Sequence, residues 1–385
     1  MIKPANIKVD PNRAYAFKSP FKVFIVRWVD AIGGFLFASK RKPILWQGIQ
    51  RIAVLRLDHL GDVLLALPAL RALELSLPNA QVDFFIGPWA KDLVEMGGLR
   101  AAPKVFSASW FVREGANGGT VKDLKDRLRD GRYDAVIELR GDFRHIWAMY
   151  WAGIKNRIGL ARTGLGFLLT HRLVYRAGQH EMKRNLDVLE QMGIHVSGPQ
   201  ELPRLYPRKE DGQIQKEIRQ KLGINRPVIA IHAVCSALSK RWPISNWQKL
   251  INGLPGDVDI VLVGTEGEKP GMAEIENGCN RKVFLTAGLL SLPVLAAFLK
   301  ECRLLIGVDS GPAHIAAAVG TPVVSLYSGT NQVEQWGPQG QKVAVIQKKT
   351  ACSPCELTVC PLGNECMNLI QVEEVLDLVS VSLQK

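Results

Sequence analysis

Short runs rich in Val, Ile and Leu alternate with amphipathic stretches along most of the chain. The apolar runs predict buried strands at 52–57, 82–86, 135–139, 227–233, 258–263, 304–308 and 321–327. The amphipathic stretches predict helices at 63–77, 121–129, 146–152, 181–192, 208–222, 247–254, 292–302 and 372–383. Strands that alternate with helices indicate an α/β protein with parallel sheets covered on both faces.

The alternation is interrupted between residues 200 and 226 and then restarts. Pro203 and Pro207 break the pattern there, and a charged helix follows. A chain of 385 residues is long enough for two domains. We therefore predict an N-terminal extension over 1–45, domains over 46–205 and 206–370, and a C-terminal helix over 371–385. Ligands of open α/β sheets bind at the carboxyl ends of the strands, so we expect the loops of both domains to face one cleft.

Residues 20–38 follow a different pattern. Bulky apolar side chains recur there at three- and four-residue spacing, which places them on one face of a helix: Phe21, Phe24, Ile25, Trp28, Val29, Ile32, Phe35 and Leu36. Lys22, Arg27 and Asp30 lie off that face, and a basic cluster follows at 40–42. The segment is too short and too charged for a membrane span, so we predict a helix in the plane of an anionic membrane surface. The alternative is a helix packed on the protein's own surface.

The chain has a strongly basic balance, with a formal net charge of +13. This excess favours an acidic partner, either an anionic membrane or a phosphorylated substrate. Without an arginine-rich tract, zinc-finger spacing or ribonucleoprotein signature, we do not expect nucleic acid as a partner. The cysteines number seven, and with no pattern of a cleavable signal peptide we expect a cytoplasmic protein.

Four of the cysteines fall close together near the C-terminus. They are Cys352, Cys355, Cys360 and Cys366. Three interpretations stay open: a tetrahedral metal site, two disulfides, or free thiols that pack a loop. In each case we expect a structural role, because four thiolates around a metal would leave no open position.

The hexapeptide from Asp309 to His314 follows one of the predicted strands and precedes an alanine-rich helix. Gly311 permits a tight turn there, and Pro312 suits the first helical position. The unpaired N–H groups of a helix N-terminus can hold a diphosphate. Asp309 and His314 would add a carboxylate and an imidazole; the alternative is an ordinary turn in which His314 packs.

Other polar residues follow predicted strands. Asp62 begins a helix after the first strand, where it could take a proton from a hydroxyl or merely cap the helix; Asp58 in the same loop has the same two interpretations. Lys240 follows a strand and suits a phosphate, or is a surface charge. Glu266 and Glu268 could accept ribose hydroxyls or remain solvated.

Three motifs occur together in one order: Arg56-x-Asp58-x2-Gly61-Asp62-Val63-x4-Pro68-Ala69-Leu70, Lys240-Arg241-Trp242-Pro243, and Asp309-Ser310-Gly311-Pro312-Ala313-His314. In these motifs the chain resembles the ADP-heptose:lipopolysaccharide heptosyltransferases, glycosyltransferase family 9. The resemblance covers roughly residues 50–380 and includes the cysteine loop. The chain departs from family members at Val234-Cys235, where they carry two adjacent threonines.

The resemblance implies a GT-B fold, with an acceptor-binding and a nucleotide-sugar-binding Rossmann-like domain facing each other across a cleft. It implies an inverting, metal-independent transfer from ADP-heptose to a lipid A–core acceptor, without a cofactor, at the cytoplasmic face of the inner membrane. Asp62 would be the general base and Lys240 would contact the donor diphosphate. The other donor-binding residues would be Glu268 (or Glu266), Asp309, Ser310, Gly311, Pro312 and His314, and the acceptor-side residues would be Arg56, Asp58 and Gly61. Two alternatives keep the fold: a different nucleotide sugar for another surface glycan, and a non-catalytic membrane-surface binding protein.

Overall fold

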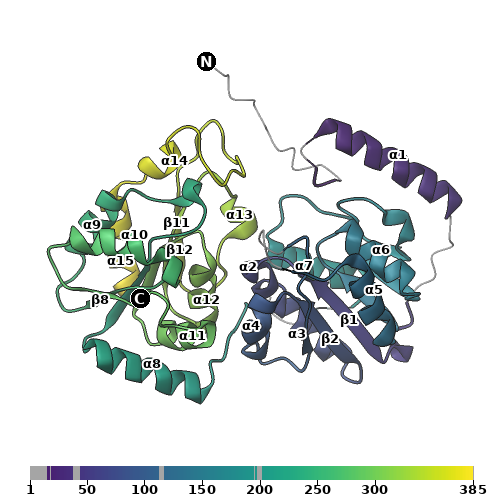
Figure 1. The fold of residues 1–385 in the computed structure, drawn as a ribbon, viewed down its shortest axis with the longest axis horizontal. Coiled ribbons are helices and arrows are strands. Elements are labelled where there is room, and N and C mark those ends of the chain that lie inside the picture. The colour runs from purple at the N-terminus through teal and green to yellow at the C-terminus, as the bar shows by residue number, and fades with distance from the viewer. Residues whose placement is uncertain are drawn as a thin grey trace. The chain divides into compact units, whose positions relative to one another are not determined.

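A computed structural model describes residues 15–17, 19–37, 44–111, 117–194, 196 and 202–384. The chain divides between Glu201 and Leu202 into two compact α/β units, called here the N-terminal and the C-terminal unit. Figure 1 shows each unit as a sheet with helices around it.

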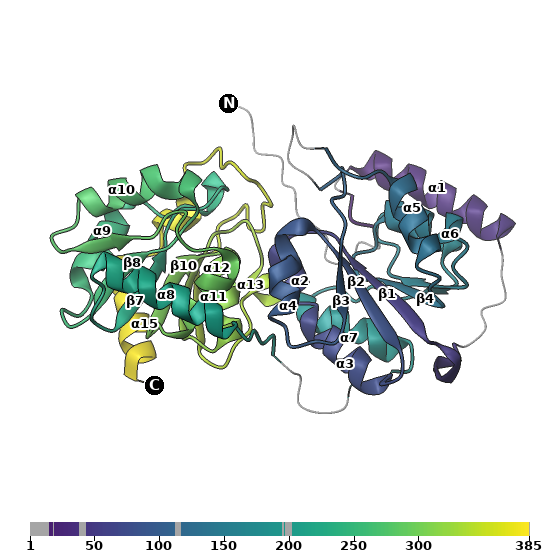
Figure 2. The ribbon, with the colours of Figure 1, turned by 60° about the horizontal axis from the view of Figure 1, so that its bottom comes forward.

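The N-terminal unit contains a six-stranded sheet in which every strand pair is parallel, in the order β3-β2-β1-β4-β5-β6. Its strands are β1 (Arg51–Arg56), β2 (Gln81–Ile86), β3 (Ala102–Val105), β4 (Ala135–Glu138), β5 (Asn156–Gly159) and β6 (His171–Arg172). Its helices are α1 (Pro20–Leu36), α2 (Leu60–Leu64), α3 (Leu67–Ser76), α4 (Lys91–Glu95), α5 (Val121–Asp130), α6 (Phe143–Trp151) and α7 (Glu181–Gln191), with short 3-10 turns η1 (Trp46–Gly48), η2 (Pro88–Ala90) and η3 (Gly166–Leu168). Helices α5 and α6 cover one face of this sheet, and α3 and α7 cover the other (Figure 2).

The C-terminal unit contains a second six-stranded parallel sheet, in the order β12-β11-β10-β7-β8-β9. Its strands are β7 (Val228–His232), β8 (Asp259–Leu262), β9 (Val283–Leu285), β10 (Leu304–Val308), β11 (Val323–Tyr327) and β12 (Val343–Gln347). Its helices are α8 (Lys209–Leu222), α9 (Ile244–Gly253), α10 (Lys269–Asn277), α11 (Leu292–Lys300), α12 (Gly311–Val319), α13 (Val333–Trp336), α14 (Glu365–Asn368) and α15 (Val372–Gln384), with η4 (Leu238–Lys240) and η5 (Glu266–Glu268). The C-terminal helix α15 packs on α9 and β11 of this unit.

The two units have the same strand order. Counted from the first strand of each unit, both sheets run 3-2-1-4-5-6, which is the order of the Rossmann fold. The chain leaves the first strand on one side and returns to the fourth strand on its other side. The loops therefore diverge between β1 and β4 in one unit and between β7 and β10 in the other. Such switch points are where open α/β sheets bind ligands at the carboxyl ends of their strands.

Local sequence signals explain where the helices begin and end. The helix predicted over 63–77 is two helices in the structure, because α2 ends at Leu64 and α3 begins at Leu67 with Pro68 in its first turn. Helix α6 begins earlier than predicted, at Phe143, since the Asp142 side chain accepts the backbone N–H of Arg144 and caps it. The helix predicted over 20–38 is confirmed as α1. In the described part of the chain, no helix combines the length and the hydropathy needed to cross a bilayer.

Candidate functional site

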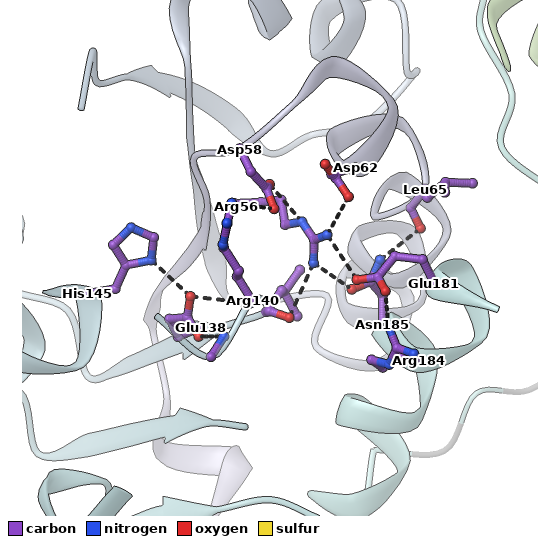
Figure 3. A network of polar contacts seen from close by, with 12 residues as sticks. Arg56, Asp58, Asp62, Leu65, Glu138, Arg140, His145, Glu181, Arg184 and Asn185 are labelled. Atoms are coloured by element: carbon purple, nitrogen blue, oxygen red, sulfur yellow. Dashed lines mark hydrogen bonds and ion pairs between the residues drawn. The ribbon is translucent and has the colours of Figure 1, made fainter. Parts of the chain in front are cut away.

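Arg56 is the centre of a buried polar network at the carboxyl end of β1 (Figure 3). Its guanidinium forms ion pairs with three carboxylates, each at 2.9 Å: Nε with Asp58 Oδ1, and Nη2 with Asp62 Oδ1 and Glu181 Oε1. Its Nη1 donates to the carbonyl oxygen of Leu139 at 3.2 Å. The planar guanidinium suits this arrangement, since it presents several N–H groups in fixed directions.

Asp62 lies in the first turn of α2 and is buried. The cap position of α2 belongs to His59, and the Asp62 carboxylate instead binds Arg56. The capping alternative for Asp62 is therefore wrong, because its side chain reaches across to the end of β1. The structure brings the expected base Asp62 together with two of the expected acceptor-side residues, Arg56 and Asp58, and the third, Gly61, precedes Asp62 in α2.

The buried charges of this network are neutralised by ion pairs with one another rather than by solvent. Burial raises the pKa of Asp58 above its usual value, although Arg56 acts in the opposite direction. For Arg56, burial favours the neutral form, but the neighbouring carboxylates of Asp58 and Asp62 outweigh it and raise the pKa. The guanidinium therefore stays charged and holds Asp62 in a fixed position.

The network extends from β1 to β4, across the switch point of the N-terminal unit. Arg140 binds Asp58 at 3.3 Å through Nη1, and its own backbone N–H donates to Glu138 Oε1 at 3.2 Å. Glu138 ends β4, is fully buried, and pairs with His145 Nδ1 at 2.9 Å. Glu138 also accepts the backbone N–H of Gly141, so its carboxylate is held on both oxygens.

Helix α7 completes the network with residues that the sequence analysis did not select. Glu181 pairs with Arg56 and with Arg184, and Asn185 Nδ2 donates to the carbonyl oxygen of Leu65 at 3.1 Å. The signal available in the sequence was three polar residues at helical spacing in 181–185. That spacing is equally typical of a solvated helix face. These residues could be assigned to the network only once the fold had placed α7 beside the end of β1.

The C-terminal unit gathers polar groups at its own switch point, around Asp309. This residue follows β10, and its Oδ2 lies 2.6 Å from Lys240 Nζ and accepts Asn331 Nδ2 at 2.7 Å. Lys240 Nζ also donates to the backbone oxygen of Asp309 at 3.3 Å. The second and third motifs therefore meet, and Asn331 is a member that the sequence analysis missed.

Ser310 occupies the N-cap position of α12, and its side chain links this position to β7 instead of capping the helix. Its Oγ lies 2.8 Å from His232 Nδ1, and His232 is the last residue of β7. Gly311 and Pro312 form the first turn of α12, as predicted, and His314 is buried one turn along. A helix N-terminus with adjacent lysine and serine side chains can hold the oxygens of a diphosphate.

Glu268 and Glu266 occupy different environments on η5. Glu268 accepts the backbone N–H of Thr265 at 2.7 Å and lies 3.7 Å from His232 Nε2, whereas Glu266 is exposed and pairs with Lys269. Burial would raise the pKa of Glu268, but the contacts with His232 and Thr265 outweigh it and lower the pKa. Glu268 is therefore a fixed anion near Ser310, and Glu266 is a solvated charge.

The cysteine loop forms a separate feature of the C-terminal unit. Cys352, Cys355, Cys360 and Cys366 line one small cavity, and all seven cysteines of the chain are free thiols. The Cys366 sulfur accepts the backbone N–H of Gly329 at 3.1 Å. Within the described residues, no group of three or more His, Cys, Asp or Glu is placed to hold a metal ion. Of the three interpretations, free thiols that pack a loop match the structure.

Comparisons with known proteins agree with this arrangement. A family model described as glycosyltransferase family 9 (heptosyltransferase) matches residues 121–365. The lipopolysaccharide heptosyltransferase 3 of Escherichia coli K12 is 28% identical over 304 residues, which are 74% of this chain and 83% of that protein.

Two solved structures have the same fold. The glycosyl transferase family 9 protein from Veillonella parvula DSM 2008 has a TM-score of 0.77 at 20% identity, covering 90% of this chain and 99% of its own. The E. coli ADP-heptose lps heptosyltransferase II has a TM-score of 0.69 at 20% identity, covering 87% of this chain and 99% of its own.

Proposed function

This chain belongs to glycosyltransferase family 9, the heptosyltransferases, and we propose that it moves a heptose from ADP-heptose to the inner core of lipopolysaccharide. Two similar proteins support the choice of substrates, since one is named for lipopolysaccharide and the other for both ADP-heptose and lipopolysaccharide. The N-terminal unit would bind the acceptor and the C-terminal unit the nucleotide sugar.

The observation that carries the proposal is the fixed carboxylate of Asp62. Arg56 holds it at the carboxyl end of β1, where an open sheet accepts its ligand. In the proposed reaction an acceptor hydroxyl attacks the anomeric carbon of the heptose while ADP departs from the opposite face. A new C–O bond replaces the bond to the phosphate oxygen, the configuration inverts, and the hydroxyl proton passes to Asp62.

Departure of ADP places negative charge on its terminal phosphate, and the C-terminal unit offers groups to stabilise it. Lys240 and the N–H groups after Ser310 would contact the diphosphate, so that the transfer would be independent of a metal. Lys240 is now paired with Asp309, and a diphosphate would compete for this ammonium group. Asp309, released from Lys240 but still bound to Asn331, could then accept a sugar hydroxyl. His314, Gly311 and Pro312 would shape the sugar pocket, and Glu268 would lie on the nucleoside side.

The acceptor chemistry fits the charge of the chain. Lipid A–core is rich in phosphate and acidic sugar and is anchored in a membrane. A protein with net charge +13 would be attracted to such a surface. We propose that the enzyme acts peripherally at the cytoplasmic face of the inner membrane.

The test replaces Asp62 by asparagine, which keeps the size of the side chain but removes its basicity. Asp62→Asn is expected to lower the rate of ADP release with a core acceptor by about two orders of magnitude or more, while ADP-heptose still binds in calorimetry. The matched control is Asp130→Asn, at an exposed aspartate of α5 in the same unit, which should keep full activity. Normal turnover by Asp62→Asn would remove this residue from the role of base.

A donor panel tests the sugar. Release of ADP from ADP-heptose, without release of UDP from UDP-sugars, would support the proposed donor. Mass spectrometry of the product on defined truncated cores would identify the acceptor. Transfer from another nucleotide sugar alone would overturn the assignment of heptose, and no transfer from any donor would favour the non-catalytic alternative.

A further inference from the structure

Helix α1 is docked on the N-terminal unit through a side that carries one carboxylate, a glycine and two half-buried valines, Val23 and Val26. Asp30 is buried in this contact and accepts the hydroxyl hydrogen of Tyr15 at 2.6 Å. Gly33 is buried one turn later, and a Cβ atom built there would lie only 2.4 Å from the ring of Phe167. Phe37, just after the helix, packs against Phe167 at a ring distance of 5.5 Å. The inner side of α1 therefore fits the protein closely with a carboxylate and a glycine.

The outer side of α1 carries the large apolar residues. Between 56% and 85% of the surface of six side chains is exposed: Phe21, Phe24, Trp28, Ile32, Phe35 and Leu36. At 100° per residue, these six fall within an arc of about 120°. The residues that point inward lie on the opposite side of the helix axis.

This arrangement reverses the usual pattern of a surface helix. Such a helix normally turns its apolar stripe toward the core and its polar face toward water. Here the close fit around Asp30 and Gly33 instead leaves the bulkiest apolar side chains of α1 on the outside. A contiguous apolar patch of this kind marks an interaction surface rather than ordinary exposure. The alternative of a helix packed on the protein's own surface is confirmed in part: α1 packs on the N-terminal unit, but its bulkiest apolar side chains stay exposed.

Helix α6 lies beside α1 and carries two exposed tryptophans of its own. Figures 1 and 2 both show α1 beside α6, and Phe37 contacts the ring of Tyr150 in α6 at 6.1 Å. Trp147 and Trp151 are exposed on α6, and their rings lie 6.2 Å apart. Tryptophan prefers the boundary between lipid and water, because its ring is apolar and its N–H can reach polar head groups.

Charge decides which partner fits this surface. Lys22 and Arg27 are exposed, and at 100° per residue they fall on the two borders of the apolar arc. The sequence adds Lys40, Arg41 and Lys42 just beyond the helix. Basic residues beside an apolar face are typical of helices that lie on anionic membranes, since their long side chains reach the phosphates while the aromatic rings enter the bilayer.

We propose that α1 and α6 together form a membrane-docking surface, in which the outer face of α1 and the two tryptophans of α6 insert into the head-group region of an anionic bilayer. This proposal adds a defined membrane-binding surface to the proposed function. It rests on the proposed function in one respect, the location of the acceptor in a membrane. Helix α6 also links this surface to the polar network, because Glu138 precedes it and His145 lies on it. Its nine residues span about 13 Å, so a membrane-anchored acceptor could reach the carboxyl end of β4 without leaving the bilayer.

Co-sedimentation of the full chain with vesicles tests the surface without any heptose or acceptor. Wild type should bind vesicles of phosphatidylcholine with added phosphatidylglycerol more strongly than phosphatidylcholine alone, and added salt should weaken binding. Phe24→Ser and Trp28→Ser should each lower the partition coefficient about tenfold or more, because each removes a large inserted ring. Trp147→Ser should lower the partition coefficient as well, because it removes a ring that inserts from α6. This variant tests α6 independently of α1.

The matched control is Leu75→Ser, at an equally exposed apolar residue on α3 of the same unit, which should bind vesicles as wild type does. Circular dichroism checks that each variant is folded. Transfer to a water-soluble acceptor should be unchanged in all of them, so failure of docking is distinguishable from failure of the proposed activity. Equal vesicle binding by wild type, Phe24→Ser and Trp28→Ser would overturn the proposal. It would also be overturned by light scattering that shows a dimer which the same substitutions dissociate, since the surface would then join two copies of this chain.

Discussion

Replacement of Arg56 by methionine tests the polar network of the N-terminal unit most directly. Methionine keeps much of the length and apolar volume of the side chain but removes the guanidinium. Asp58 and Glu181 would each keep another cation, Arg140 and Arg184 respectively. Asp62 would lose the ion pair that holds it at 2.9 Å. The variant therefore leaves buried carboxylates with too few cations around them.

The size of the effect follows from this loss. Removal of one partner from a buried ion pair costs about 3–5 kcal/mol, because the remaining charge stays desolvated. Arg56 serves three carboxylates, but two of them retain a partner, so we expect the cost of one such pair rather than three. The unit should then melt about 10 °C lower at neutral pH. Arg56→Lys should recover only part of this stability, since one ammonium group cannot reach all three carboxylates in the fixed geometry of a guanidinium.

Asp58 adds a smaller part to this loss, and the pH dependence of that part has a definite sign. The pKa of Asp58 is already raised by burial, and Arg56 acts to lower it. Without Arg56 the folded-state pKa of this carboxyl rises further above its unfolded value. A carboxyl with a raised pKa binds its proton more tightly in the folded protein than in the unfolded chain. The folded protein therefore loses stability as the pH rises from the unfolded-state pKa to the folded-state pKa of this carboxyl. This part of the destabilisation should be small near about pH 4 and should grow as the pH rises toward neutral.

Urea unfolding followed by circular dichroism, at acidic and neutral pH, measures the difference between wild type and Arg56→Met. The matched control is Arg129→Met, at an exposed arginine of α5 whose pair with Asp126 should contribute less than about 1 kcal/mol. Equal stability of Arg56→Met and wild type at neutral pH would refute the reasoning. A loss that grows as the pH falls would refute the assignment of the effect to buried carboxylates.

Two further predictions concern the C-terminal unit. Lys240→Met should lower kcat for ADP release about a hundredfold or more, because the leaving phosphate loses its cation, and Lys240→Arg should restore part of the rate in the same assay. Burial raises the pKa of the Cys235 thiol to about 11, so at pH 8 Cys235 should resist alkylation in the folded protein while the exposed Cys352 reacts. Mass spectrometry of digested samples measures the labelling of both cysteines. Equal labelling would contradict the burial of Cys235.

The sequence predicts the central strands well because they are buried on both faces. Runs such as 304–308 are apolar without interruption, and β10 has the predicted bounds. Strands at the edges are short or only half buried, and they leave no such run. The four edge strands β3, β6, β9 and β12 were missed for this reason, and so was β5, a strand of four residues that lies next to the edge strand β6.

The candidate site could be predicted only where its residues belong to a local motif. Asp309 and Lys240 were selected because each follows a strand, and the structure pairs them at 2.6 Å. Asn331 and Glu181 come from distant segments, and their role depends on which elements the fold brings together. The family resemblance preferred Glu268 to Glu266, but the physical difference between them depends on His232, which ends another strand.

The strand order explains why charged groups collect where they do. Leu55 of β1 pairs with Glu138 of β4, and His232 of β7 pairs with Gly307 of β10. Within each unit, the first and fourth strands therefore pair almost to their carboxyl ends. Just beyond these pairs the loops diverge and leave backbone and side-chain groups without a covering strand or helix. Polar residues can be accommodated there only if they pair with one another, as Arg56 does with Asp62 and Lys240 does with Asp309. A substrate that brings its own charges and hydroxyls can replace part of that pairing. The same physical requirement that stabilises each network would therefore prepare it for the ligand proposed for its unit.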